Sequence, residues 1–338
     1  MAKFYPFPKI GNYLNTIHTV TETTRFNGFN TDGTPIYDQT KLLPTIKFNG
    51  SVKVHGTNAG IGYDPETNTL WAQSREHMLS EKSTNAGFHT YVMSHKEYFI
   101  ETMSKISSSY PVIVYGEWCG SNIQKGVAIS TLQKRLIIFA AKIITDERNP
   151  IWLTRSDIEL FFSPEKFLWN IYVFDRYEIE IDFNHPEASQ NKLNELTYAV
   201  EKECPVGRYF GKYGVGEGIV WANAEYGRFK VKGLEHCSSH ITSPAAVSGE
   251  KIASINEFVS YAVTENRLNQ GIEQVFSTHN EDIDIKHIKK FLNWITNDIS
   301  KEESSTLIEN NLLPEDVAKA VKNKARIWFV EKFNSNRS

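Results

Sequence analysis

Four short segments contain the residues whose types and spacing could do chemistry. They hold Lys53 in the run Lys-Val-His-Gly-Thr-Asn, Glu117 after an apolar run, Glu217 between two glycines, and the pair Lys230 and Lys232. A lysine amine becomes a nucleophile once its proton is removed. Two carboxylates can bind Mg²⁺, because this ion takes oxygen ligands and keeps several waters. Paired cations can neutralise charge on a phosphate. The combination therefore suits an amine that attacks a polyphosphate.

Each segment also has a simpler interpretation when it is taken alone. Lys53 could be a surface lysine beside a turn, and an acid flanked by glycines, such as Glu217, usually lies in a loop. Strand alternation places Lys230 and Lys232 on one face. Like charges on one face are unfavourable unless an anion lies against them, although a solvated strand edge is an equal alternative. The functional hypothesis rests on the combination, in which the lysine pair and a metal ion would favour the neutral amine of Lys53.

Short strands and a few helices are expected to position these segments. Residues 1–44 are rich in aromatic and turn residues and could form a peripheral strand pair. Apolar runs and turn signals predict strands at 45–48, 59–63, 69–72, 112–115, 136–140, 218–221 and 228–232. Apolar spacing predicts helices at 88–106 and from about 184 to 203.

The sequence pattern changes after the last of these predicted strands. Residues 237–250 are small and polar, which indicates a domain boundary. Beyond it the signals are helical: a capping box at 254–257, apolar spacing over 283–299, and a helix start at Leu313-Pro314. The sequence thus predicts an α+β domain over residues 1–240 and a small all-helical domain over 250–338.

Composition sets the limits within which these segments must work. The formal net charge is −3, so a nucleic-acid site would have to be a local basic patch. Three cysteines without metal-binding spacing fit a reducing compartment. The N-terminal residues lack an apolar signal core, and no stretch approaches the ~18 apolar residues of a membrane span. We expect a cytoplasmic protein.

Taken in order, the four segments resemble motifs I, III, IV and V of the covalent nucleotidyltransferase superfamily, which holds DNA ligases, RNA ligases and mRNA capping enzymes. The likeness is greatest to the phage-type RNA ligase 2 family, because His55 and the Gly-Thr-Asn tail replace the Asp-Gly usual in DNA ligases. It covers roughly residues 1–236 and includes Gly-Ser-Asn-Ile-Gln-Lys-Gly-Val at 120–127. The resemblance implies a nucleotidyltransferase domain of antiparallel sheets flanked by helices, followed by a helical domain.

The resemblance also implies a role for each matching residue. Lys53 would carry AMP, with Lys230 and Lys232 on the phosphates. Glu217 would act beside the metal, and Glu117 would contact the ribose and assist at the metal. The remaining expected contacts are Phe139 on adenine, Arg75 on the nucleotide and the RNA ends, and His55 and Asn58 on the RNA ends.

The implied activity is ATP-dependent sealing of RNA 3′-hydroxyl and 5′-phosphate ends, possibly in a nicked duplex, with Mg²⁺ or Mn²⁺. We expect a monomer with no obligate protein partner and no membrane contact. Three alternatives remain open: a DNA or mixed-substrate ligase on the same scaffold, a guanylyltransferase, and a non-catalytic nucleotide- or RNA-binding protein. The intact set of charged residues argues against the last of these. The lack of strand signals after Lys232 argues against the guanylyltransferase, which would carry further strands.

Overall fold

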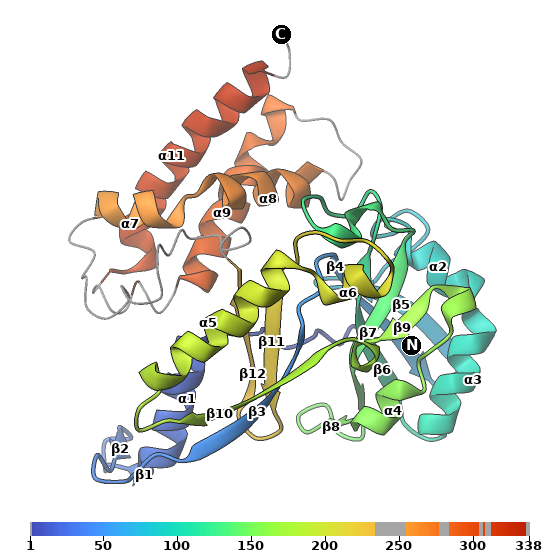
Figure 1. Ribbon diagram of the computed structural model, residues 1–338, viewed down its shortest axis with the longest axis horizontal. Coiled ribbons are helices and arrows are strands. Elements are labelled where there is room, and N and C mark those ends of the chain that lie inside the picture. The colour runs from blue at the N-terminus through green and yellow to red at the C-terminus, as the bar shows by residue number, and fades with distance from the viewer. Residues whose placement is uncertain (1, 234–254, 277–283, 304–306, 308–311, 336–338) are drawn as a thin grey trace. The chain divides into compact units, whose positions relative to one another are not determined.

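The computed structural model describes residues 2–233, 255–276, 284–303, 307 and 312–335. These residues form an α+β protein with antiparallel sheets and a helical C-terminal region, as the sequence predicts (Figure 1). The chain divides into two compact units. The first comprises 1–9, 51–177 and 202–217, and the second comprises 10–50, 178–201 and 218–338. The expected boundary at 237–250 lies outside the described residues.

A six-stranded sheet forms the centre of the first unit. Its main path runs β5-β4-β6-β7-β8, all antiparallel, and β9 pairs with β7 in parallel. The strand bounds are β4 Thr57–Asp64, β5 Thr69–Ser74, β6 Val112–Cys119, β7 Arg135–Ile143, β8 Ile151–Trp152 and β9 Leu168–Asn170. The predicted strands in this part of the chain are confirmed. The near-continuous apolar runs form β6 and β7, and both strands lie inside the sheet. A strand that is buried on both faces requires such a run.

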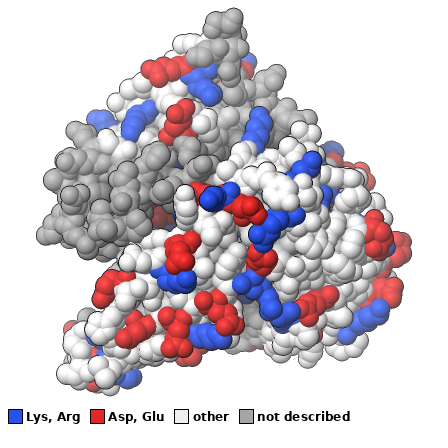
Figure 2. All heavy atoms as spheres, in the orientation of Figure 1, with Lys and Arg blue, Asp and Glu red and all other residues white. Residues whose placement is uncertain are grey.

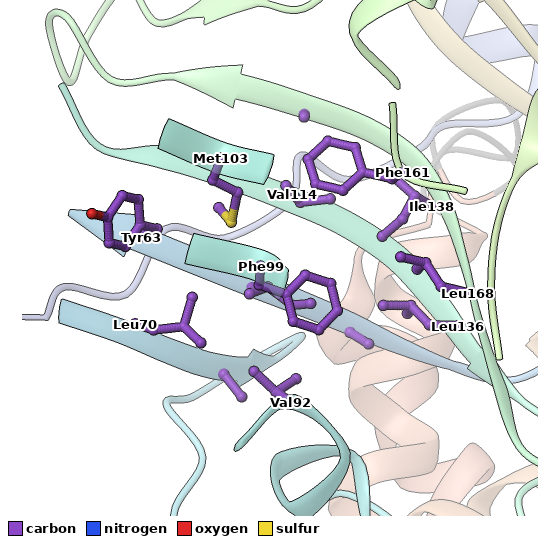
Figure 3. Packing of buried hydrophobic residues seen from close by; sticks show 14 of the residues in the cluster. Tyr63, Leu70, Val92, Phe99, Met103, Val114, Leu136, Ile138, Phe161 and Leu168 are labelled. Carbon is purple, nitrogen blue, oxygen red and sulfur yellow. The ribbon is translucent and has the colours of Figure 1, made fainter. Parts of the chain in front are cut away.

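Three helices supply the packing for one face of this sheet. They are α2 Phe88–Ser94, α3 Lys96–Ile106 and α4 Arg155–Glu159. Phe99 and Met103 of α3 pack with Val114 and Ile138 of the central strands, and all four are fully buried (Figure 3). Burying such side chains stabilises the fold by about 1.5–3 kcal/mol each. The packing fixes the position of β6 in the core, and β6 carries Glu117.

The helix predicted over 88–106 is divided in two at His95, whose backbone has φ −119° and ψ 26°. The ring nitrogen Nδ1 of His95 lies 2.9 Å from the carbonyl oxygen of Tyr91. Ser94 Oγ donates to the same carbonyl at 2.9 Å, so side chains occupy an acceptor in the last turn of α2, and the next helix begins at Lys96. The predicted single helix is therefore wrong in its continuity and right in its extent.

The second unit contains a four-stranded sheet of order β10-β3-β11-β12. Its strands are β3 Thr45–Val52, β10 Arg176–Asp182, β11 Gly218–Asn223 and β12 Gly227–Lys232. Buried and exposed residues alternate along β3, as expected of a strand with one face in a core. Helix α5 Glu187–Lys202 begins and ends close to its predicted bounds. The next helix in the chain, α6 Pro205–Tyr209, belongs to the first unit.

The N-terminal segment differs from expectation in one element. The predicted strand pair is present as β1 Phe26–Phe29 and β2 Pro35–Tyr37, but α1 Tyr13–Arg25 precedes it. Asn12 and Asn15 form a reciprocal cap, each side chain accepting from the other's backbone N–H, which satisfies free donors at the start of α1. The sequence prediction missed this helix.

The C-terminal region is helical, as predicted. Its helices include α7 Ile255–Ala262, α8 Glu265–Phe276, α9 Ile288–Glu302 and α11 Pro314–Ser335. They share one apolar core, in which Phe258, Phe291, Ile295 and Phe329 are fully buried. The helix α8 was not predicted. Ser254, the start of the proposed capping box, lies outside the described residues.

Charge on the surface agrees with the near-neutral composition. On the face shown in Figure 2, basic and acidic side chains of the described residues lie interspersed. None of the described helices combines the length and the apolar character needed to cross a membrane.

Candidate active site

Lys53, His55 and Glu217 converge in the first unit. Lys53 Nζ donates to Glu217 Oε2 at 2.8 Å, and His55 Nδ1 lies 3.1 Å from the same oxygen. The Glu217 side chain is 3% exposed, whereas those of Lys53 and His55 are 21% and 19% exposed. A nearly buried carboxylate is thus held by two groups that can carry positive charge, and both groups keep an open side.

Sheet topology explains why residues so distant in the chain meet. Lys53 directly follows β3, and Glu217 directly precedes β11, which neighbours β3 in the four-stranded sheet. Gly218 has φ +143°, and a Cβ there would lie 2.2 Å from the Val231 carbonyl oxygen. Only glycine fits this position, which sets the direction in which the chain enters β11 from Glu217.

Glu117 binds the backbone of the segment 53–58, which begins with Lys53. It lies on β6 opposite Asn58 of β4, and its Oε1 accepts from the Gly56 N–H at 3.0 Å. Burial raises the pKa of Glu117 to about 7; Lys53 opposes this rise and the negative charge of Glu217 adds to it. A cation would stabilise these two acids together, because it offsets their mutual repulsion.

The six-stranded sheet carries an irregularity at Phe139. Tyr115 of β6 pairs with Ala140 of β7, but the next residue, Gly116, pairs with Ile138. Phe139 is therefore the extra residue of a β-bulge, a feature that redirects a side chain. Its ring contacts that of Phe7 edge-on, with centroids 5.1 Å apart. The sequence prediction of an adenine-stacking role stays a prediction.

The remaining predicted residues lie in different surroundings. Asn58 is half-buried on β4, and its carbonyl accepts from Asn85 Nδ2 at 3.3 Å. Arg75 follows β5 and is exposed. Lys230 and Lys232 belong to the second unit, where the unbroken strand β12 places both on one face as predicted.

The lysine pair has acidic neighbours within the second unit. Lys230 Nζ lies 2.7 Å from Glu302 Oε2, at the end of α9. Burial raises the pKa of the Asp298 carboxyl, while the charges of Arg267, Lys232 and Lys230 oppose the rise. Like charges on one strand face are thus offset by carboxylates in the described part of this unit.

Sequence reasoning missed two residues that contact the segment 53–58. Gln124 Nε2 donates to the Gly56 carbonyl at 3.3 Å. Asn85 Oδ1 accepts from Thr57 Oγ1 at 3.1 Å, and its backbone adopts a left-handed φ of 48°. The run at 120–127 contributes to the family resemblance, but nothing in the sequence indicates a contact of Gln124 with Gly56.

Comparison with known proteins places these residues in a family. The family model for RNA ligase matches residues 47–232, which contain Lys53, Glu117, Glu217 and the lysine pair. Comparison with curated protein sequences gave no match.

Similar solved structures include an RNA ligase from Naegleria gruberi with PPi, at 16% identity and a TM-score of 0.45. Variants of the same enzyme with ATP and Mn, and with AMP and Mn, both match at 15% identity, with TM-scores of 0.44 and 0.45. In each comparison 69% of this chain is covered, and this chain spans 57% of the Naegleria chain. Because the family match extends over more than half of the 338 residues and includes the converging acid and lysine side chains, this chain belongs to the RNA ligase family.

Proposed function

We propose that this protein is an ATP-dependent RNA ligase in which Lys53 carries AMP as a covalent intermediate. The observation that carries the proposal is the contact of the Lys53 amine with a nearly buried Glu217, beside His55, inside the segment that matches the family. A lysine held at a fixed position by a carboxylate, with one side open, is suited to attack a phosphate that approaches from that side.

The first step joins AMP to the protein. The Lys53 amine attacks the α-phosphorus of ATP, so that an N–P bond forms and the P–O bond to pyrophosphate breaks. The attacking amine must give up a proton, and we assign its uptake to Glu217 on the basis of the 2.8 Å distance between Nζ and Oε2. Cationic side chains would stabilise the negative charge that develops on the phosphate, a role that we assign to Lys230 and Lys232.

The second and third steps use the bound AMP to seal a strand. An oxygen of an RNA 5′-phosphate attacks the AMP phosphorus, the N–P bond breaks, and the Lys53 nitrogen takes up a proton. A 3′-hydroxyl then attacks the 5′-phosphorus, releasing AMP and a proton. We assign contacts at the RNA ends to His55, Asn58 and Arg75, and the adenine contact to Phe139.

The carboxylates of Glu117 and Glu217 fit a divalent metal of the Mg²⁺ type. Both supply oxygen ligands, and their mutual repulsion contributes to the raised pKa of Glu117. Among the described residues no cluster of three or more potential ligands is present. Two carboxylates suffice for Mg²⁺, which keeps most of its waters and draws further ligands from phosphates. When bound, the ion would supply charge neutralisation at the phosphates.

The direct test is incubation with radiolabelled ATP and Mg²⁺, after bound nucleotide has been stripped from the protein. We expect a labelled protein–AMP adduct that is stable in acid and absent from Lys53→Ala. Exposed Lys105 provides a matched control, and Lys105→Ala should be labelled like the wild type. If the wild type gives no adduct with ATP or GTP, the proposal is wrong.

Sealing assays separate the substrate alternatives. We propose a monomer that seals nicked RNA duplexes faster than nicked DNA duplexes of the same sequence. Faster sealing of DNA would instead favour the mixed-substrate ligase. EDTA should stop both adduct formation and sealing, and added Mg²⁺ or Mn²⁺ should restore them.

A further inference from the structure

The peptide groups on both sides of Gly56 are held by side chains. The N–H of Gly56 donates to Glu117 Oε1 at 3.0 Å, and its carbonyl accepts from Gln124 Nε2 at 3.3 Å. A Cβ at Gly56 would lie 2.4 Å from the Trp118 carbonyl oxygen and 2.9 Å from Cys119 Cβ. The backbone of Gly56 thus lies directly against β6 with no room for a side chain.

The loop that carries Gln124 has an unusual backbone. Gly120, Asn122 and Gly126 all have positive φ, at 121°, 60° and 81°. A Cβ at Gly120 would lie 2.8 Å from the carbonyl oxygen of Leu132, so the loop packs tightly where it leaves β6. Non-glycine residues such as Asn122 adopt this conformation at a cost. This loop, with its unfavourable backbone conformation at Asn122, places Gln124 at Gly56.

The nitrogen and the oxygen of the Gln124 amide differ in their hydrogen bonding. Its side chain is buried, with the residue 8% exposed, and Nε2 makes the bond to Gly56. Within the described residues, its Oε1 has no hydrogen-bond partner. The buried amide is therefore held through its donor, which lies on the Gly56 carbonyl.

We propose that Gln124 is a positioning residue. Together with Glu117 it forms a clamp on the two peptide groups that flank Gly56, and this clamp fixes the backbone that carries Lys53 and His55. This inference rests on the proposed function for its kinetic consequence. Gly56 follows His55 directly and lies three residues after Lys53, so a shift of its peptide moves both side chains. A displacement of about 1 Å at a reacting group can cost on the order of 100-fold in rate.

Two substitutions separate the donor from the bulk of the side chain. Gln124→Met keeps the approximate volume and removes the donor. Gln124→Glu keeps the shape, and it donates to the Gly56 carbonyl only while its carboxyl is protonated. The matched control is Gln73→Met, because Gln73 is also buried and donates from Nε2 to a backbone carbonyl, that of Tyr5.

The kinetic readout is the single-turnover rate of protein–AMP formation at saturating ATP. For Gln124→Met we expect at least a tenfold loss, with the half-saturating ATP concentration within threefold of wild type. Gln73→Met should stay within threefold in rate. The rate of Gln124→Glu relative to wild type should rise as pH falls from 9 to 6, because the protonated acid restores the donor. The corresponding ratio for Gln124→Met should be flat.

A second readout does not depend on activity. Amide hydrogen exchange at Gly56 should become at least tenfold faster in Gln124→Met and remain unchanged in Gln73→Met. The clamp is refuted by wild-type exchange at Gly56 in folded Gln124→Met. If that variant fails to fold, unchanged exchange in Gln124→Glu at pH 9 refutes it. A flat rate ratio for Gln124→Glu, or an equal loss in Gln73→Met, refutes the positioning role. Faster exchange in a protein that forms no adduct would uphold the clamp while the proposed ligase function fails.

Discussion

Lys53 and Glu217 are separated by 164 positions in the chain, yet Nζ and Oε2 lie 2.8 Å apart. The contact joins the end of β3 to the start of β11, two neighbouring strands. A lysine and an acid from distant segments are thus brought together by the order of the strands in one sheet. The contribution of this contact to the free energy of unfolding can be measured, and so can the effects of the groups around it.

The Lys53–Glu217 pair should show strong energetic coupling in a double-mutant cycle. Removing Lys53 alone leaves the Glu217 carboxylate, 3% exposed, without its lysine, which typically costs about 3–5 kcal/mol. We expect Lys53→Met and Glu217→Gln together to cost clearly less than the sum of the single changes. Urea unfolding of the four proteins measures the coupling. The exposed pair Lys105–Glu101, also at 2.8 Å, is the control and should couple by less than about 1 kcal/mol. Equal coupling in the two pairs would contradict the role of burial.

The raised pKa of Glu117 predicts a pH-dependent stability. Between its ordinary pKa of 4.5 and its folded value of about 7, the folded protein binds a proton that the unfolded chain releases. Stability should therefore fall as pH rises through this window, by about 3 kcal/mol in total. Glu117→Gln removes the effect and keeps an acceptor for Gly56. Relative to wild type, the variant should gain about 2–3 kcal/mol between pH 5 and pH 8 in urea unfolding. The exposed Glu76→Gln serves as control, and an equal gain there would contradict the assignment.

Phe139 should matter for nucleotide affinity if it stacks on adenine. Stacking of a base on an aromatic ring contributes about 1–3 kcal/mol. We therefore expect Phe139→Leu to weaken ATP binding by about tenfold, measured calorimetrically in the Lys53→Ala background, where no adduct forms. Trp152→Leu, in the same aromatic cluster, should leave the affinity within threefold. A similar loss in both variants would indicate that the cluster acts through packing alone.

Arg267 should be critical for the helical region. Its side chain is fully buried and donates to Asp298 Oδ2 at 3.0 Å and to Glu303 Oε1 at 2.8 Å. Removing one member of a buried charged network typically costs about 3–5 kcal/mol. We expect Arg267→Met to lower the unfolding free energy by that amount and to speed hydrogen exchange in α8 and α9. Arg326→Met, at an exposed position of α11, should change neither. Unchanged exchange in Arg267→Met would show that the network is not required.

The accuracy of the element predictions followed the strength of the local pattern. Apolar runs such as Val112–Tyr115 predicted central strands, because a strand buried on both faces must be apolar throughout. The helix α1 was missed because its buried residues Tyr13, Thr16 and Val20 are separated by polar and threonine-rich positions. Threonine has low helix propensity, and tertiary packing outweighs it here. At the break, the side chains of Ser94 and His95 both contact the Tyr91 carbonyl, and apolar spacing does not reveal such contacts.

The sequence by itself determined the chemical types in this protein: a lysine in a Gly-Thr-Asn segment, two acids beside strands, and a lysine pair on one strand face. These are properties of residue identity and of period-two alternation, and both are local. Only the tertiary structure decided which of them meet. It joined Lys53 and His55 to Glu217, raised the pKa of Glu117 to about 7 by burial, and brought Gln124 to the Gly56 carbonyl. Strand order, burial and a loop with left-handed residues produce these contacts, and each depends on parts of the chain far from the residue concerned.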